Sequence, residues 1–213
     1  DTNFGNYFGK MYQPRYLSGL AAGAMTESNK IGYVAAFPIP EVIRGINAFA
    51  TGVKEVNPDA TVEVVWTFTW FGPEAETQAA NALLETGVDV LAQHQDSPST
   101  GIAAEAAGAK WISYNTAYGQ DAAPGAFVTA PVWDWGPYYV EIVESIINDE
   151  FVAEAYWGGM ETGLVSLYEL TSDVPTETAS LISDRTEEII SGSYDPPIVE
   201  EEFIDNVIGT VNP

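Results

Sequence analysis

The chain has 213 residues, of which 46% are hydrophobic, enough for one large domain or two small ones. Its 31 acidic and 7 basic residues give a formal charge of -24, which excludes a basic nucleic-acid groove and argues against anionic membranes. The absence of cysteine excludes disulfides, thiolate nucleophiles and cysteine-based zinc sites. Because lysine is scarce and acid abundant, the composition also indicates adaptation to high salt, which screens the repulsion between like charges.

The first predicted element is a helix over residues 3–25, interrupted near Pro14. Aromatic and large apolar residues dominate its first half, whereas residues 17–24 are mostly small. Small side chains permit close packing, so we interpret this segment as a buried core helix. Residues 26–29 end the helix and lead into the next element.

The next unit is a strand, a loop and a helix. Residues 31–36 form a short apolar run typical of a strand. Residues 37–40 break this run, because their two prolines lack the N–H that a strand ladder needs. Residues 41–53 carry apolar side chains at helical spacing, so the unit places an aromatic residue, Phe37, at the tip between strand and helix.

The same unit recurs down the chain. Further strands are predicted at 61–67, 88–92, 110–113 and 126–130, and helices at 73–85, 99–107 and 138–147. Strands that alternate with helices at this spacing indicate a parallel, doubly wound α/β sheet. Right-handed crossovers then place every strand-to-helix loop on one edge of the sheet, and ligands bind at that edge.

Aromatic and polar side chains collect at the exits of these strands. They are Phe37, Trp70, His94, Asp96, Tyr114, Asn115, Trp133 and Trp135. Large aromatics on a loop edge are not needed for a sheet core, and they suit a flat ligand held by stacking and a few hydrogen bonds. Trp133 and Trp135 alternate along the chain, and we expect them to face opposite ways. Trp66 and Trp111 lie within predicted strands and are expected in the core.

The pattern changes after residue 148. Residues 151–156 and 164–170 are predicted strands, with a hairpin turn at Gly158 and Gly159 between them. Residues 176–191 form a predicted helix that begins acidic, and the tail at 198–213 is expected to pack as a short strand or helix.

The sequence offers little sign of catalysis. It contains no GxGxxG motif between a strand and a helix and no Walker sequence. His94 is the only histidine, and with Asp96 nearby it could serve as a hydrolytic base or a metal ligand, but one histidine with scattered carboxylates is weak support for either. We therefore predict a binding protein rather than an enzyme, with no cofactor and no metal.

Several blocks of sequence closely resemble one known family. The resemblance is carried by GYVAAFPIPEVIRGINAF (32–49), QHQDSP (93–98), PVWDWGPYY (131–139) and YWGGM (156–160). These blocks resemble the basic-membrane-protein family of substrate-binding lipoproteins. The resemblance implies a type I periplasmic-binding fold, with two α/β lobes that close on a ligand. It also implies delivery of purine nucleosides or related molecules to an ABC importer permease, outside the cytoplasm.

The resemblance also implies a division into lobes. Residues 1–29 and 156–213 would form part of the first lobe with the hinge crossings, and residues 30–155 would form a Rossmann-like second lobe. Family members have a longer segment upstream, with a lipid anchor and most strands of the first lobe. We therefore expect the first lobe to be incomplete here, because the apolar segment 3–25 follows no strands that it could cover.

The resemblance finally implies a pocket. Family members stack a purine on an aromatic residue in the loop that matches Trp70, which is retained. They hold the ribose with an aspartate at the position of Asn115 and a lysine near Trp133, and both charges are missing here. We therefore expect a free purine base such as adenine, or another flat heterocycle. The predicted ligand-binding residues are Phe37, Trp70, His94, Asp96, Asn115, Trp133, Trp135 and Trp157.

The sequence is also compatible with two other functions. One is a purine nucleoside-binding protein, and the other is a ligand-sensing regulatory protein on the same fold. An enzyme on a doubly wound sheet is a weaker rival, since it would require a nucleophile with a base beside it.

Overall fold

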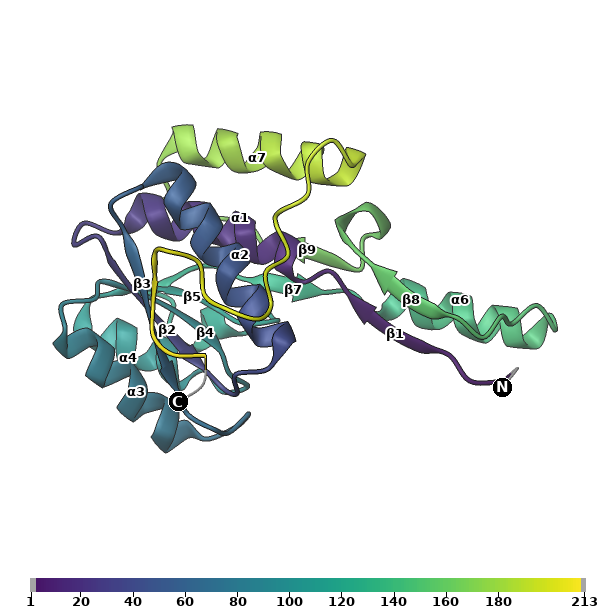
Figure 1. Cartoon of the computed structure of the whole chain (residues 1–213), viewed down its shortest axis with the longest axis horizontal. Coiled ribbons are helices and arrows are strands. Elements are labelled where there is room, and N and C mark those ends of the chain that lie inside the picture. The colour runs from purple at the N-terminus through teal and green to yellow at the C-terminus, as the bar shows by residue number, and fades with distance from the viewer. Residues whose placement is uncertain (1–2, 212–213) are drawn as a thin grey trace.

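The computed structural model describes residues 3–211 and consists of a body and a projecting arm (Figure 1). The body is built on a six-stranded parallel sheet with the order β10-β3-β2-β4-β5-β6. Its strands are β2 (Lys30–Ala35), β3 (Thr61–Trp66), β4 (Val90–His94), β5 (Lys110–Ile112), β6 (Phe127–Thr129) and β10 (Val207–Ile208). The predicted doubly wound parallel sheet is confirmed.

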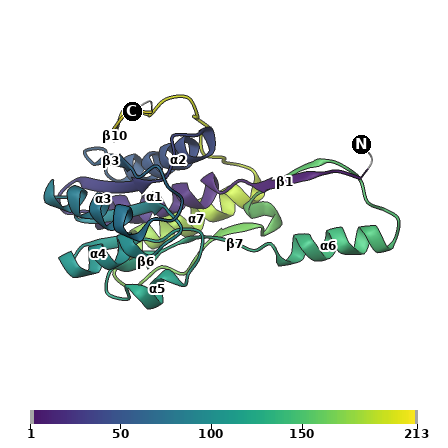
Figure 2. The ribbon, with the colours of Figure 1, turned by 90° about the horizontal axis from the view of Figure 1, so that it is seen from below.

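Helices cover both faces of this sheet (Figures 1 and 2). They are α1 (Tyr12–Met25), α2 (Pro40–Val56), α3 (Pro73–Glu85), α4 (Ser99–Ala107), the short α5 (Gly119–Ala122) and α7 (Thr176–Ser191). Neighbouring strand residues point to opposite faces, so Tyr33 belongs to the core under α1 and α2, while Val34 belongs to the core under α3 and α4. Helix α7 packs outside α1.

The strand order defines where a ligand can enter. From β2 the chain passes through α2 to β3 on one side, and then through α3 to β4 on the other side of β2. The gap between the carboxyl ends of β2 and β4 is therefore the topological switch point, where open α/β sheets bind their ligands.

Helices α1 and α2 cross at very short range because glycines face each other. A Cβ added to Gly19 would lie 2.0 Å from the carbonyl oxygen of Phe49, and one added to Gly52 would lie 2.1 Å from that of Tyr16. Neither distance is compatible with a side chain, so the small residues noted in the sequence serve a backbone-to-backbone contact. This contact buries most of α1 in the body.

The arm extends from the body as a separate feature (Figures 1 and 2). Its members are β1 (Asn6–Gly9), which pairs in parallel with β8 (Ala155–Gly158), and α6 (Gly136–Ile147), which has no buried residue. The antiparallel pair β7 (Pro131–Trp133) and β9 (Val165–Leu167) joins the arm to the body, and the 3₁₀ helix η1 (Met160–Thr162) lies between β8 and β9.

The tail runs back over α2 and is held by one buried side chain. Asn47 donates from Nδ2 to the carbonyl oxygens of Val199 (3.0 Å) and Glu202 (2.8 Å), and its Oδ1 accepts from the N–H of Ile204 (3.1 Å). The tail then adds β10 to the edge of the sheet beside β3, and Phe203 stacks on Trp66. The tail thus packs in part as a short strand, as predicted. Trp111 lies in the core as expected, but the same expectation for Trp66 is wrong, because it is only half-buried at the end of β3, where the tail covers it in part.

Two predictions about elements are wrong. Residues 6–9 form a strand instead of the start of a helix, because they pair with β8, which lies far along the chain. Gly158 and Gly159 do not form a hairpin turn, since β8 pairs with β1 and β9 pairs with β7. The division into lobes at residue 29 stays a prediction; among the described residues, α1 packs on α2 and on the sheet formed by the segment 30–155 and the tail.

Candidate functional site

An open cleft of about 570 Å³ lies at the carboxyl edge of the sheet, between the body and the base of the arm. Its lining residues are Phe8, Ile39, Glu41, Arg44, Trp70, His94, Tyr114, Asn115, Trp133 and Trp135. They come from the loops that follow β2, β3, β5 and β7, from the end of β4, from the first turns of α2, and from β1 and β7. The cleft thus covers the switch point between β2 and β4.

Aromatic rings form two walls of the cleft. On the body side, Trp70 packs against Phe37 with ring centroids 5.3 Å apart, and a backbone hydrogen bond of 2.9 Å from Asp96 N to Trp70 O ties the two loops together. On the arm side, Trp133 and Trp135 stack at 4.8 Å with an interplanar angle of 17°. The expectation that these two tryptophans face opposite ways is wrong, because residues two apart in an extended chain lie on the same side.

The floor of the cleft holds a close pair of one imidazole and one carboxylate at the switch point. Nε2 of His94, at the end of β4, lies 3.2 Å from Oε2 of Glu41, in the first turn of α2. Burial alone would raise the pKa of the Glu41 carboxyl, but His94, Arg15 and Arg44 outweigh burial and lower it to about 2. Burial and the positive charge of Arg15 lower the pKa of His94, so the imidazole is neutral near pH 7 and Glu41 is ionised.

A buried arginine lies beneath this pair. Arg15, on α1, is 3% exposed, and its Nη1 donates to Tyr33 Oη at 2.9 Å. Its guanidinium lies 5.0 Å from the centroid of the Tyr114 ring, a cation–π contact that also fixes the ring lining the cleft. Within residues 3–211, no carboxylate lies within 4.0 Å of Arg15, and its Nε and Nη2 have no hydrogen-bond partner.

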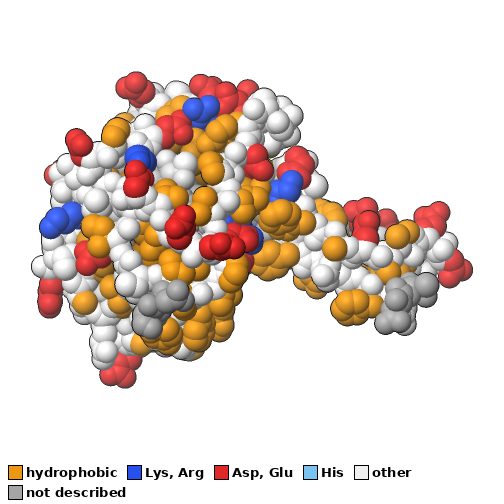
Figure 3. Space-filling view, viewed as in Figure 1, with side chains coloured by type: hydrophobic (Ala, Val, Ile, Leu, Met, Phe, Trp, Pro, Cys, Tyr) orange, Lys and Arg blue, Asp and Glu red, His pale blue; other side chains and the backbone are white. Residues whose placement is uncertain are grey.

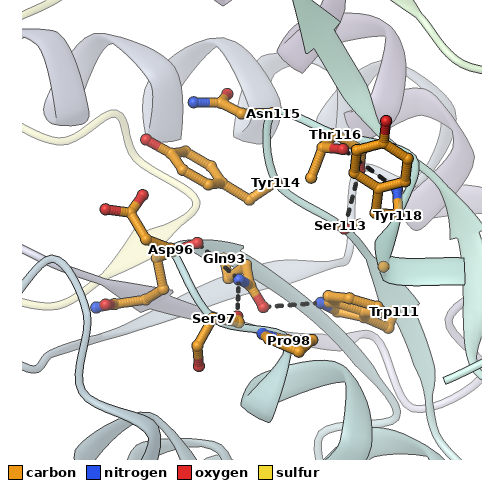
Figure 4. A pocket seen from close by; sticks show the side chains of 12 residues that line it. Gln93, Asp96, Ser97, Pro98, Trp111, Ser113, Tyr114, Asn115, Thr116 and Tyr118 are labelled. Carbon is orange, nitrogen blue, oxygen red and sulfur yellow. Dashed lines mark hydrogen bonds between the residues drawn. The ribbon is translucent and has the colours of Figure 1, made fainter. Parts of the chain in front are cut away.

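A second cavity of about 400 Å³ adjoins the cleft behind Tyr114 and Asn115 (Figure 4). Gln93 organises its wall: Nε2 donates to the carbonyl oxygens of Gln95 (2.9 Å) and Ser97 (2.8 Å), and Oε1 accepts from Trp111 Nε1 (3.1 Å). These bonds fix the loop after β4, which also carries Asp96. Burial raises the pKa of the Asp96 carboxyl.

The predicted site residues come together in part. Trp70, His94, Asn115, Trp133 and Trp135 line the cleft. The remaining three lie beside it: Phe37 backs Trp70, Asp96 lines the adjoining cavity, and Trp157 lies on β8 with the Arg44 guanidinium 5.5 Å from its ring centroid.

Sequence reasoning did not assign Glu41, Arg44 or Arg15 to the site. A signal for Glu41 was present, since it follows the strand-ending prolines and opens a helix at the ligand edge. A lone arginine in an apolar helix was a signal for Arg15.

Residues 3–211 offer neither a cluster of metal ligands nor a membrane-spanning helix. No group of three or more His, Asp or Glu side chains there is arranged to hold a metal ion. Among the helices described, none is long and apolar enough to cross a bilayer.

Comparison with known proteins gives a consistent result. The family model for Bmp, the PnrA-like ABC transporter substrate-binding proteins, matches residues 1–197. A putative ABC transporter glucose-binding protein of Haloferax volcanii is 46% identical over 193 residues, covering 91% of this chain and 49% of the relative. A purine-binding protein of Brucella abortus is 35% identical over 199 residues, covering 91% of this chain and 55% of the relative. The chain thus spans about half the length of these curated relatives.

A solved structure supports the fold. An ABC transporter solute-binding protein from Conexibacter woesei superposes with a TM-score of 0.75 at 24% identity, covering 93% of this chain and 67% of that protein.

Proposed function

The chain belongs to the Bmp family of PnrA-like ABC transporter substrate-binding proteins, and on that premise we propose that it binds a purine nucleobase, adenine-like, or a related flat heterocycle. The ligand is taken up by an ABC importer, and the protein passes it to the permease. Proteins of this class work outside the cytoplasm, and we propose a lipid anchor on the full-length protein. The role is binding without chemical turnover.

The aromatic walls of the cleft carry this proposal. Trp70 on the body side and the stacked pair of Trp133 and Trp135 on the arm side offer flat faces around one open space. Stacking of a base on an aromatic side chain contributes on the order of 1–3 kcal/mol and needs no charge on the ligand. Asn115, which both donates and accepts, would meet the polar edge of the ring.

A monosaccharide is the second candidate ligand, and two observations favour it. The relative with 46% identity is named for glucose, while the one with 35% identity is named for purine. The cleft also contains an ionised carboxylate, Glu41, beside tryptophan faces, and this combination suits sugar hydroxyls above an indole. A nucleoside, which has both a base and a sugar, is the intermediate case.

Calorimetry on the full-length protein tests the proposal. Adenine, adenosine and glucose would be titrated separately, and mass spectrometry would identify any ligand carried through purification. We expect adenine to bind more tightly than adenosine or glucose, with each ligand recovered unchanged. Tighter binding of glucose would establish the second candidate, and conversion of a ligand to product would overturn a purely binding role.

A further inference from the structure

Resting on this proposed function, we propose that Glu41 is the specificity-determining residue of the cleft, accepting hydrogen bonds from a ligand edge that carries N–H or O–H donors. The inference goes beyond stacking because it fixes the polarity of the ligand. An amino-substituted heterocycle and a polyhydric ring both present such an edge, whereas an anionic ligand does not.

The position of Glu41 is the first support. It is the second residue of α2, directly after Pro40, so the strand-ending loop and the helix together fix its backbone at the switch point. Its side chain is 25% exposed and lines the cleft, in contrast to the neighbouring His94, whose side chain is 2% exposed. Glu41 is thus anchored on a rigid element with its carboxylate facing the space that a ligand would fill.

The orientation of the carboxylate is the second support. His94 Nδ1 and Arg15 Nε both lie within 4 Å of the place where a Cβ on Gly45 would stand. A guanidinium on that side disfavours a proton on Nδ1, so Nε2 carries the imidazole proton and is directed to Oε2 of Glu41. Among the described residues, no other donor hydrogen-bonds to this carboxylate, whose side chain is 25% exposed and lines the cleft.

The charges around Glu41 are the third support. Arg44, one turn further along α2, pairs with Glu200 of the tail and stacks over Trp157, and it forms no ion pair with Glu41. Because the carboxylate is ionised, it accepts hydrogen bonds and donates none. A ligand carboxylate or phosphate would be repelled at this point, and a neutral ligand with donors would be favoured.

The test compares Glu41→Gln with a matched control. Glu74→Gln is that control, since Glu74 also follows a proline as the second residue of its helix, α3, but is exposed and lines neither cavity. Calorimetry would use two ligand pairs that differ in donors: adenine with unsubstituted purine, and glucose with 2-deoxyglucose. If adenine binds more tightly than purine, the donor is the amino group of a base. If glucose binds more tightly than 2-deoxyglucose, the donor is a sugar hydroxyl.

We expect Glu41→Gln to weaken binding of the donor-rich ligand by roughly 10- to 100-fold, as for loss of a hydrogen bond to a charged group, and to reduce the preference within its pair. Glu74→Gln should change neither quantity. Glu41→Asp, which keeps the charge, should retain part of the preference, and thermal unfolding would verify that each variant is folded. Binding by the wild type with an unchanged preference in Glu41→Gln would overturn this inference alone. Failure of the wild type to bind any of the four ligands would overturn the proposed function as well.

Discussion

Trp70 lies in the loop after β3, where the residue is 38% exposed and its ring packs against Phe37. If a base stacks on it, Trp70→Ala should weaken ligand binding by roughly 10- to 100-fold, because one stacked ring contributes on the order of 1–3 kcal/mol. Phe71→Ala is the control, since Phe71 is the adjacent residue, is 64% exposed and does not line the cleft. Calorimetry showing equal affinities for wild type and Trp70→Ala would remove Trp70 from the site.

His94 makes the stability of the protein depend on pH. Burial and Arg15 depress its pKa below the ordinary 6.5, against the opposing effect of Glu41, so the unfolded chain binds a proton before the folded one does. The free energy of unfolding should therefore fall as pH drops below 6.5, by at most about 1.4 kcal/mol per pH unit. It should be at its full value above 6.5. Urea unfolding at a series of pH values measures this slope.

The His94→Gln variant separates this effect from that of the many carboxylates. His94 is the only histidine in the sequence, so the variant has no imidazole to titrate between pH 5 and 6.5. We expect a flatter dependence of stability on pH in the variant over this window. If the free energy of unfolding falls with pH at the same rate in wild type and variant, groups other than His94 control the stability below pH 6.5.

Residues at loop tips proved more predictable than residues that open helices. Trp70 and Asn115 line the cleft, and the sequence already placed them at the ligand edge because aromatic and amide side chains at strand exits have few other roles. Glu41 was not assigned, because in a sequence with 31 acidic residues a glutamate in the first turn of a helix is expected for the helix dipole alone. Its place in the cleft became visible only in the structure, where His94 at the end of β4 lies 3.2 Å from it.

The crossing of α1 and α2 is the element-scale feature most sensitive to substitution. Gly52→Ala would place a methyl group 2.1 Å from the carbonyl oxygen of Tyr16, so the helices must separate. Overpacking of this kind costs about 1–3 kcal/mol, and a clash with backbone belongs at the upper end. Gly136→Ala is the control, because its Cβ would meet only a side-chain oxygen of Asp134 at 3.2 Å. Unfolding in urea should show a large decrease in the free energy of unfolding for Gly52→Ala and little change for Gly136→Ala.

Elements with local signals were predicted well, and elements that depend on distant pairing were not. The helix at 176–191 agrees with α7 because its apolar spacing and flanking residues are encoded locally. Residues 6–9 look helical by their aromatic spacing, yet they form β1 because β8, far along the chain, supplies its hydrogen-bond partners. A hydrophobic pattern cannot distinguish such cases, since the partner strand is remote in sequence.

At the scale of the whole molecule, the alternation of strands and helices was sufficient to predict a doubly wound sheet, and the family resemblance correctly indicated the fold. The division into lobes stays a prediction, and which sheet the apolar helix α1 covers could not be read from the sequence. That choice is made by the glycine contacts between α1 and α2, which are packing details.

Charge is the dominant whole-molecule property. Acidic side chains are spread over the face shown in Figure 3, with few basic groups between them. Most of the basic residues already pair with carboxylates, namely Lys10, Arg44, Lys54, Lys110 and Arg185. Added salt would weaken these surface pairs, each worth about 0–1 kcal/mol, but it would also screen the repulsion among a much larger number of unpaired carboxylates. The stability gained by screening the repulsion should exceed the stability lost from the ion pairs, because the chain has 31 acidic residues and only 7 basic ones.

We therefore expect the melting temperature to rise from low salt to molar potassium chloride. The variant Asp184→Asn/Glu187→Gln provides a control, since it removes two exposed charges three residues apart on α7 that no described basic side chain contacts. If repulsion limits stability, this variant should melt higher than wild type at low salt, and the difference should shrink as salt is added, because screening has then removed the same repulsion. A neutral osmolyte such as sucrose should raise the melting temperature of both proteins equally, since it favours burial of the protein surface and does not screen charge. A melting temperature that is flat or falls with salt would mean that the ion pairs outweigh the repulsion, and the acidic composition would then require an explanation other than adaptation to salt.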